Sequence, residues 1–456
     1  MSNESLQFLE REKKRLTLEI DRLERVREAI KKQRTKPPHL CDFAEVLRKC
    51  HAVYTSTLPN RLERIAGEGM PAELASLMIS DLYSHIKDFC DTMHSIAVNA
   101  LEGVARELYY LLDQFLDYHT TPTDKYIVFI HDQIAVQTFG NLLLTKGFDK
   151  TYPEFWEGLK DVEFYFVSVT ESMAKGTYSL NWPLILHEMA HIVCYHKSVN
   201  MDFLKKVPMF GEIEIDRGKE QEEMPQQIGL IKKQDESARM KRHITEFLAD
   251  IMVSRCFGVV YGWRLFEMYG ALSSVFEPTT DHPSEYKRIE LIATELEGQM
   301  GRRKNATFLR RRLPSPPATN PAMERNQKKI DAELGRVLPK VRSYSSYVLT
   351  NDQEKYSLRS GPWSKTLVLC GKTMKEKTVD NLQKELFEGK PIILEPPALY
   401  SIAVQNPTKA QALLDPPTKE DKERADKILE LLAECIRLYE VQREFATNVE
   451  PLRLES

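Results

Sequence analysis

Apolar residues recur every seven positions near the N-terminus, which is the repeat of a coiled-coil seam. The repeat consists of Leu9, Leu16, Leu23 and Ile30, with Leu6 and Ile20 at alternate core positions. Lys13 and Arg27 occupy the other alternate positions and weaken the seam. The pattern predicts a helical arm over residues 5–34, within a first segment 1–36. Two interpretations stay open: pairing with a partner helix or a second chain, and packing of a charged helix on its own domain.

The next part of the chain predicts more helix, followed by a small sheet. Residues 71–118 contain a single glycine, Gly103, and carry apolar residues at helical spacing, so residues 37–120 are predicted as a helical region. Residues 126–130 and 162–169 are rich in β-branched and aromatic side chains, which is typical of strands. The patterning therefore predicts a mainly helical α+β protein.

Three further segments follow from the pattern. Residues 121–300 are predicted as one central domain, interrupted by a charged, weakly patterned insertion at 201–238. An insertion of this length is either a lid over a site or a surface excursion. Residues 301–321 are basic and proline-rich and are predicted as a linker. Residues 322–456 are predicted as a helical C-terminal region that ends in a long helix.

The composition is that of a folded protein with a well-solvated surface. Of the 456 residues, 42% are hydrophobic and 29% are charged, and the formal net charge is -3. This balance gives no case for nucleic acid or an anionic membrane. No stretch approaches the ~18–20 uncharged apolar residues of a membrane span, and no signal peptide is evident. The seven cysteines are odd in number and lack Cys-x-x-Cys spacing, which indicates reduced thiols. We therefore expect a cytoplasmic protein.

The candidate chemistry begins with His187, Glu188 and His191 in an otherwise apolar stretch, an HExxH pentapeptide. Two histidines four positions apart lie on one side of a helix, so both imidazoles can reach one metal ion. Glu188 could take a proton from a water on that metal and pass it to a leaving amine. The plain alternative is a core helix with two satisfied histidines and a paired glutamate.

A second segment places Glu246 and Asp250 one turn apart on a helix with an apolar stripe. A catalytic Zn²⁺ needs three protein ligands and an open fourth position, and Glu246 would be the third ligand after His187 and His191. Asp250 would accept a hydrogen bond from the free ring nitrogen of a ligand histidine. The alternative is an exposed acidic pair.

HExxH followed on a later helix by ExxxD resembles the motif of the gluzincin metallopeptidases. The resemblance implies a zincin-like domain with a small twisted sheet, a Zn²⁺ cofactor and a peptide or protein substrate. Nothing in the chain resembles the Gly-x-Met-Glu-Asn motif of gluzincin aminopeptidases, which favours an endopeptidase. Residues 162–169 are the candidate edge strand that would pair with extended substrate backbone.

A third segment, residues 281–289, reads Asp-His-Pro-Ser-Glu-Tyr-Lys-Arg-Ile and resembles the HP-x-x-x-x-R-I stretch of CaaX-protease-type gluzincins. Members of that group generally carry transmembrane helices, so the resemblance is to a zincin core of that general type. His282 is the candidate oxyanion donor, oriented by Asp281 or another carboxylate. The alternative role for His282 is a helix cap. Arg288 is expected to pair with a buried acid near the zinc helix.

A function of another class stays open beside the zinc metallopeptidase. The chain could be a coiled-coil interaction or regulatory protein whose zincin core is structural or catalytically silent. The charged arm at residues 5–34, which could support self-association, favours this alternative. The intact Glu188 disfavours it, because a purely structural metal site does not need that carboxylate.

Overall fold

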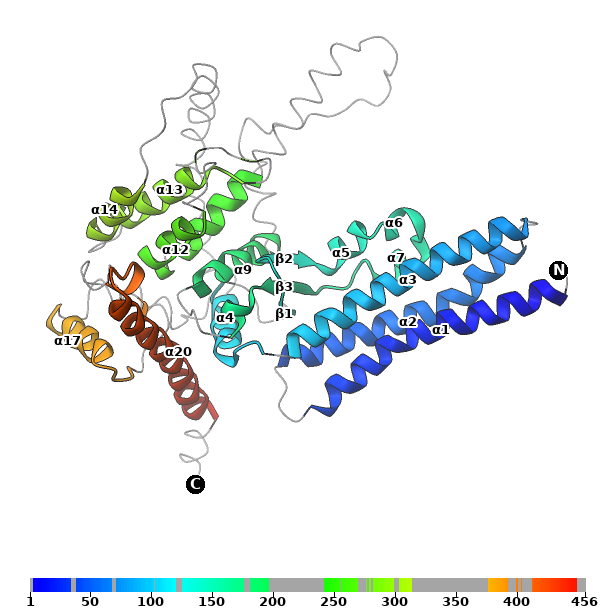
Figure 1. The fold of residues 1–456 in the computed structure, drawn as a ribbon, viewed down its shortest axis with the longest axis horizontal. Coiled ribbons are helices and arrows are strands. Elements are labelled where there is room, and N and C mark those ends of the chain that lie inside the picture. The colour runs from blue at the N-terminus through cyan, green and yellow to red at the C-terminus, as the bar shows by residue number, and fades with distance from the viewer. Residues whose placement is uncertain are drawn as a thin grey trace, which may run out of the picture. The chain divides into compact units, whose positions relative to one another are not determined.

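The computed structural model is mainly helical with one small sheet, so the predicted α+β class is confirmed at this level (Figure 1). The residues that the structure describes are 3–33, 38–67, 71–101, 103–119, 125–175, 181–196, 242–254, 256–269, 276, 279, 282–298, 303–313, 376–392, 399–400, 403 and 412–448. The chain divides into two compact units. Unit 1 is Met1–Tyr109 with Thr123–Lys175, and unit 2 is Tyr110–Pro122 with Gly176–Ser456. None of the described helices combines the length and the apolar character that a membrane crossing requires.

Three long helices form a bundle in unit 1: α1 (Asn3–Lys32), α2 (Pro38–Gly67) and α3 (Ala72–Leu101). The heptad positions of α1 face the inside of this bundle, with at most 1% exposure at Leu16, Ile20, Leu23 and Ile30. They belong to one core with apolar residues of α2 and α3. Arg27, at a weak seam position, is paired with Glu24 and Glu28 of its own helix. The heptad repeat of α1 is therefore used within its own chain, as the second interpretation of the arm expects.

Tyr54 on α2 is fully buried in this core, where its ring lies against Phe89 and Phe155. Among the described residues its hydroxyl has no hydrogen-bond partner. A buried hydroxyl without a partner costs about 1–3 kcal/mol. We therefore expect Tyr54→Phe to raise the free energy of unfolding by about 1 kcal/mol, measured as a higher denaturant midpoint.

Tyr152→Phe is the matched control for this prediction. Tyr152 is also buried, at 2% exposure, but its hydroxyl donates a partly buried hydrogen bond to Asp81 Oδ2 at 2.7 Å. Removing that hydroxyl should lower the free energy of unfolding by about 1 kcal/mol. A loss of stability in Tyr54→Phe would show that the Tyr54 hydroxyl has a partner after all, such as a buried water.

The sheet of unit 1 contains β1 (Tyr126–Ile130), β2 (Ala135–Thr138) and β3 (Tyr165–Val169). β3 lies in the centre, parallel to β1 and antiparallel to β2. The prediction that residues 162–169 supply an edge strand is therefore wrong, because both sides of β3 are already paired. The reason is visible in the burial: four of the five β3 residues are buried, whereas β2, an edge strand, has none. A near-continuous apolar run is typical of a strand that is covered on both faces.

Short helices follow the bundle along the chain: α4 (Arg106–His119), α5 (Phe139–Thr145), α6 (Phe148–Thr151), α7 (Pro153–Leu159) and α8 (Glu171–Ala174). Helix α7 packs closely on α2 at Gly158, where an added Cβ would lie 2.7 Å from Val53 Cγ1. This close packing helps to explain why residues 123–175 group with the N-terminal helices. The predicted central domain, 121–300, is divided accordingly: its strands belong to unit 1 and its motif helices to unit 2.

The regular elements described in unit 2 after Gly176 are all helices: α9 (Trp182–His196), a helix over residues 242–254, α12 (Val259–Tyr269), α13 (Glu285–Gly298), α14 (Arg303–Arg312), α17 (Glu376–Phe387) and α20 (Lys419–Asn448). Helix α12 contacts α9, α13 and α14.

Helix α14 corrects the predicted linker at 301–321. Ala306 and Leu309 are buried, and Arg310 pairs with Glu297 of α13. The segment was predicted as a linker because of its basic composition. Its apolar residues Ala306 and Leu309 are three positions apart, which suits one face of a helix. The insertion 201–238 and the segment 314–375 lie outside the described residues.

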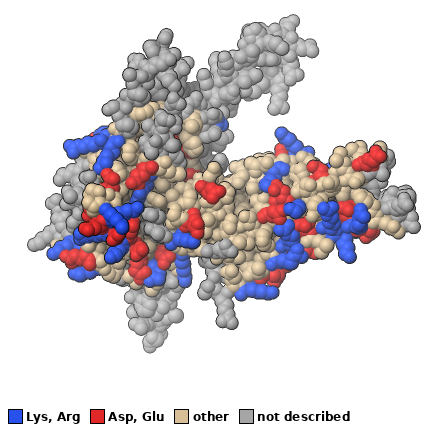
Figure 2. All heavy atoms as spheres, in the orientation of Figure 1, with Lys and Arg blue, Asp and Glu red and all other residues tan. Residues whose placement is uncertain are grey.

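Acidic and basic side chains are interspersed on the face of the molecule seen in Figure 2. Some of them pair between helices, such as Arg22 of α1 with Asp91 of α3 at 2.7 Å. Surface pairs of this kind contribute at most about 1 kcal/mol each. The described part of this face therefore shows the balanced charge that the composition indicates.

Candidate metal centre

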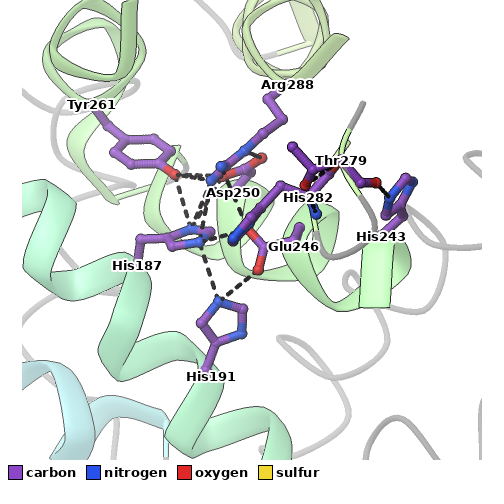
Figure 3. A network of polar contacts seen from close by, with 9 residues as sticks. All are labelled: His187, His191, His243, Glu246, Asp250, Tyr261, Thr279, His282 and Arg288. Atoms are coloured by element: carbon purple, nitrogen blue, oxygen red, sulfur yellow. Dashed lines mark hydrogen bonds and ion pairs between the residues drawn. The ribbon is translucent and has the colours of Figure 1, made fainter. Parts of the chain in front are cut away.

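Helix α9 carries the HExxH pentapeptide, and its apolar composition places that pentapeptide inside unit 2. Pro183 lies in the first turn, where its missing N–H leaves no helical hydrogen bond unmade. Ile185, Leu186 and Met189 are fully buried and hold the helix in the core. Nevertheless the side chain of His187, at 7% exposure, points toward a polar cluster (Figure 3). The cluster supplies the partners that a buried imidazole needs.

Candidate ligand atoms of three residues converge in this cluster. His187 Nε2 lies 3.2 Å from His191 Nε2 and 3.1 Å from Glu246 Oε2. His191 Nε2 lies 3.2 Å from the other oxygen of the same carboxylate, Glu246 Oε1. Glu246 comes from the helix over residues 242–254, 59 positions after His187. The second sequence segment therefore meets the first at the residues that the prediction named (Figure 3).

The three residues fit a zinc ion in number and in ligand type. Two imidazole nitrogens and one carboxylate oxygen form the His₂Glu set of catalytic zinc sites, which keep a fourth position open. Ligands about 2.0–2.1 Å from a tetrahedral zinc ion lie about 3.3 Å from one another. The observed separations of 3.1–3.2 Å, which involve one Glu246 oxygen for each histidine, are close to that value.

Glu188 lies beside the two histidines. A carboxylate oxygen of Glu188 and one nitrogen each of His187 and His191 all lie within 4.8 Å of one another. Unlike Glu246, Glu188 is partly exposed. A carboxylate that water reaches, next to a cluster of ligand atoms, can exchange protons with a reacting water molecule.

Charge within the cluster favours an ionised Glu246. Burial by itself would raise the pKa of the Glu246 carboxyl, but His187 and Arg288 hold that pKa well below its usual range. Burial and Arg288 lower the pKa of His187, yet Glu246 and Asp250 outweigh them and raise it to about 9. A metal ion that binds His187 Nε2 must displace a proton from that imidazole.

Asp250 lies on the Nδ1 side of His187, away from the ligand atoms. Arg288 reaches both sides of the ring, because its Nη2 also lies 3.2 Å from His187 Nε2 and its Nη1 lies 3.5 Å from Glu246 Oε2. Asp250 is fully buried, and its Oδ1 lies 3.1 Å from His187 Nδ1. Arg288 donates from Nε to Asp250 Oδ2 at 2.9 Å and from Nη2 to Oδ1 at 2.8 Å. Burial opposes ionisation of Asp250, but Arg288 and His187 hold the pKa of this carboxyl far below its usual range. The expected pairing of Arg288 with a buried acid is confirmed, and so is the contact between Asp250 and a histidine.

Tyr261 is a member of the cluster that sequence reasoning missed. Its hydroxyl lies 2.9 Å from His187 Nδ1 and is hydrogen-bonded to Asp250 Oδ1 (Figure 3). Tyr261 is fully buried on α12, in the run Val-Val-Tyr-Gly-Trp. A tyrosine in such a run is indistinguishable by pattern from one that only fills a core.

His282 reaches the cluster from the turn before α13. Its Nδ1 lies 3.2 Å from Glu246 Oε2, and its side chain is 52% exposed. The hydrogen bond with Glu246 raises the pKa of His282. The turn is closed by hydrogen bonds between His282 and Thr279, whose carbonyl lies 3.1 Å from His243 Nε2. Asp281 lies outside the described residues, so the carboxylate seen to contact His282 is Glu246.

Comparison of the chain with protein-family models, with curated proteins and with solved structures found no match. The resemblance to gluzincins therefore rests on the motif residues. The structure brings the six residues named for the site together in one cluster: His187, Glu188, His191, Glu246, Asp250 and His282.

Proposed function

We propose that this protein is a zinc-dependent peptidase whose metal is held by His187, His191 and Glu246. The observation that carries the proposal is the convergence of ligand atoms of these three residues from two helices, with Glu188 beside them. A purely structural histidine cluster would not require the neighbouring partly exposed carboxylate. An endopeptidase is favoured because no motif for a substrate amine is recognised.

The residues divide the chemical work as follows. A zinc ion in this set would polarise the substrate carbonyl and lower the pKa of a water molecule to about 7. Glu188 takes the proton of the attacking water and then gives it to the leaving amine. His282, half exposed and with a raised pKa, donates a hydrogen bond to the carbonyl oxygen of the substrate as that oxygen gains negative charge. Asp250 holds His187 in place through Nδ1.

Glu246→Ala tests the ligand assignment. The purified wild-type chain should contain one zinc ion. Removing a residue that hydrogen-bonds to a metal ligand typically lowers metal affinity by roughly 10–100-fold, and Glu246→Ala should lower zinc affinity by more than that. Asp250→Ala should lose affinity by that smaller factor. The measurement is chelator competition with elemental analysis.

Glu290→Ala is the matched control for this test. Glu290 is a partly exposed acid on α13 that pairs only weakly with Lys287 at 3.3 Å, so zinc affinity should be unchanged. Full zinc occupancy in Glu246→Ala would remove the assignment of Glu246. Zinc at one ion per chain without turnover of any peptide would favour the regulatory alternative.

A further inference from the structure

The hydroxyl of Tyr261 contacts both His187 and the carboxylate behind it. We propose that Tyr261 is a positioning residue: it fixes the proton and the ring orientation of His187, and it thereby raises the affinity of the site for zinc. This inference rests on the metal site of the proposed function. It assigns a role to a residue of α12, which contributes no ligand.

The geometry places Tyr261 where it can orient the imidazole. Its oxygen lies 2.9 Å from His187 Nδ1, which is shorter than the 3.1 Å between Nδ1 and Asp250 Oδ1. The two rings are nearly parallel, with centroids 6.1 Å apart and planes inclined by 17°. Tyr261 and His187 are both buried, so bulk water does not compete for their hydrogen bonds.

The direction of the hydrogen bonds follows from the donors and acceptors present. Tyr261 has one hydroxyl proton, and it contacts two groups that could accept it: the Asp250 carboxylate and the imidazole nitrogen of His187. A hydrogen bond to an ionised acceptor is roughly twice as strong as a neutral one, so the proton goes to Asp250. A lone pair of the tyrosine oxygen then faces His187 Nδ1, which must be the donor. An imidazole that binds a metal is neutral, so a His187 ring that keeps its proton at Nδ1 presents an unprotonated Nε2 to the metal.

The partners of Tyr261 are themselves held in place. Arg288 binds both oxygens of Asp250, so the acceptor of the tyrosine proton is fixed in position. Helix α12 is held close to α14 at Gly262, where an added Cβ would lie 2.7 Å from Leu309 Cδ1. Tyr261, next to this glycine, is therefore placed by helix packing. A side chain that is fixed in this way orients a ligand at little cost in conformational entropy when the metal binds.

The test compares Tyr261→Phe with the wild-type chain, using Zn²⁺ as the probe in chelator competition. Phe keeps the ring and removes only the hydroxyl. Losing a group behind a metal ligand typically lowers metal affinity by about 10–100-fold. Because Asp250 still contacts Nδ1, we expect a value near the lower end, about tenfold.

Tyr109→Phe is the matched control. Tyr109 is a buried tyrosine whose hydroxyl donates to the backbone carbonyl of Val128 at 3.1 Å. This variant should lower the thermal midpoint and leave zinc affinity unchanged. A Tyr261→Phe variant that behaves in the same way, with a lower midpoint and wild-type zinc affinity, would show that Tyr261 is only structural and would overturn the proposal.

A spectroscopic readout isolates the proton itself. In the cobalt-substituted chain, the exchangeable Nδ1 proton of His187 should give a paramagnetically shifted resonance that moves in Tyr261→Phe and stays in Tyr109→Phe. An unmoved resonance in Tyr261→Phe would contradict the hydrogen bond. A wild-type chain that binds no zinc would contradict the metal site and the inference together. A tenfold effect on zinc affinity in a chain without peptide turnover would support the inference and contradict the peptidase.

Discussion

Glu188→Gln is expected to keep the zinc and to lose about 10⁴-fold or more of the rate of peptide hydrolysis. General acid–base steps contribute about 10²–10⁴-fold, and here one carboxylate serves two proton transfers, so the loss should reach the upper end of that range. Gln has nearly the shape of Glu, and Glu188 is partly exposed and not a proposed ligand, so fold and metal should survive. The assay is turnover of a quenched peptide mixture beside the zinc content of each protein.

His282→Ala provides the graded comparison. One donor to a developing oxyanion is worth about 10²–10³-fold in rate, so this variant should be less impaired than Glu188→Gln. Because His282 also contacts Glu246, the zinc content of the variant must be measured and should be that of the wild type. If Glu188→Gln hydrolysed peptides at a rate near that of the wild type, Glu188 would not be the general base.

Arg288→Met is expected to cost about 3–5 kcal/mol of folding free energy, because it leaves buried carboxylates without their counter-charge. Arg288 is 3% exposed, forms two hydrogen bonds with Asp250, and has a nitrogen 3.5 Å from Glu246. Met fills similar volume without charge, so the loss reports the charge and its hydrogen bonds. The measurement is the shift of the denaturant midpoint in the chelated protein.

Two further variants serve as comparisons for Arg288→Met. Arg310→Met removes an arginine that pairs with Glu297 near the surface of α14 and should cost at most about 1 kcal/mol. Replacing both partners of the buried pair, in Arg288→Met with Asp250→Leu, should recover part of the loss, because no unpaired charge remains at Asp250. Equal midpoints for the wild type and Arg288→Met would contradict the role of this guanidinium.

Much of the candidate site follows from local spacing. His187 and His191 are four positions apart, and so are Glu246 and Asp250, so each pair lies on one face of its helix whatever the fold. Spacing alone does not decide whether the two helices meet. The distances from Glu246 to both histidines show that they do. Tyr261 had no signal, because its role depends on where the packing of α12 places one oxygen atom.

The fold shows the same division between local and long-range information. The seam of α1 and the apolar strand β3 were predicted from periodicity and residue type. Their partners were not, because strand order and helix pairing depend on contacts between distant segments. β3 is central only because the short, partly exposed β2 pairs with it, and α1 packs on α2 and α3 only because those helices complete its apolar stripe.

Zinc content and peptide turnover, measured together on the full chain before and after metal removal, test the central claim most directly. We expect one zinc ion per chain, turnover of the peptide mixture, loss of that turnover on chelation, and its return when Zn²⁺ is restored. Turnover that persists at full rate in the metal-free chain, or a chain that takes up no zinc at His187, His191 and Glu246, would contradict the account.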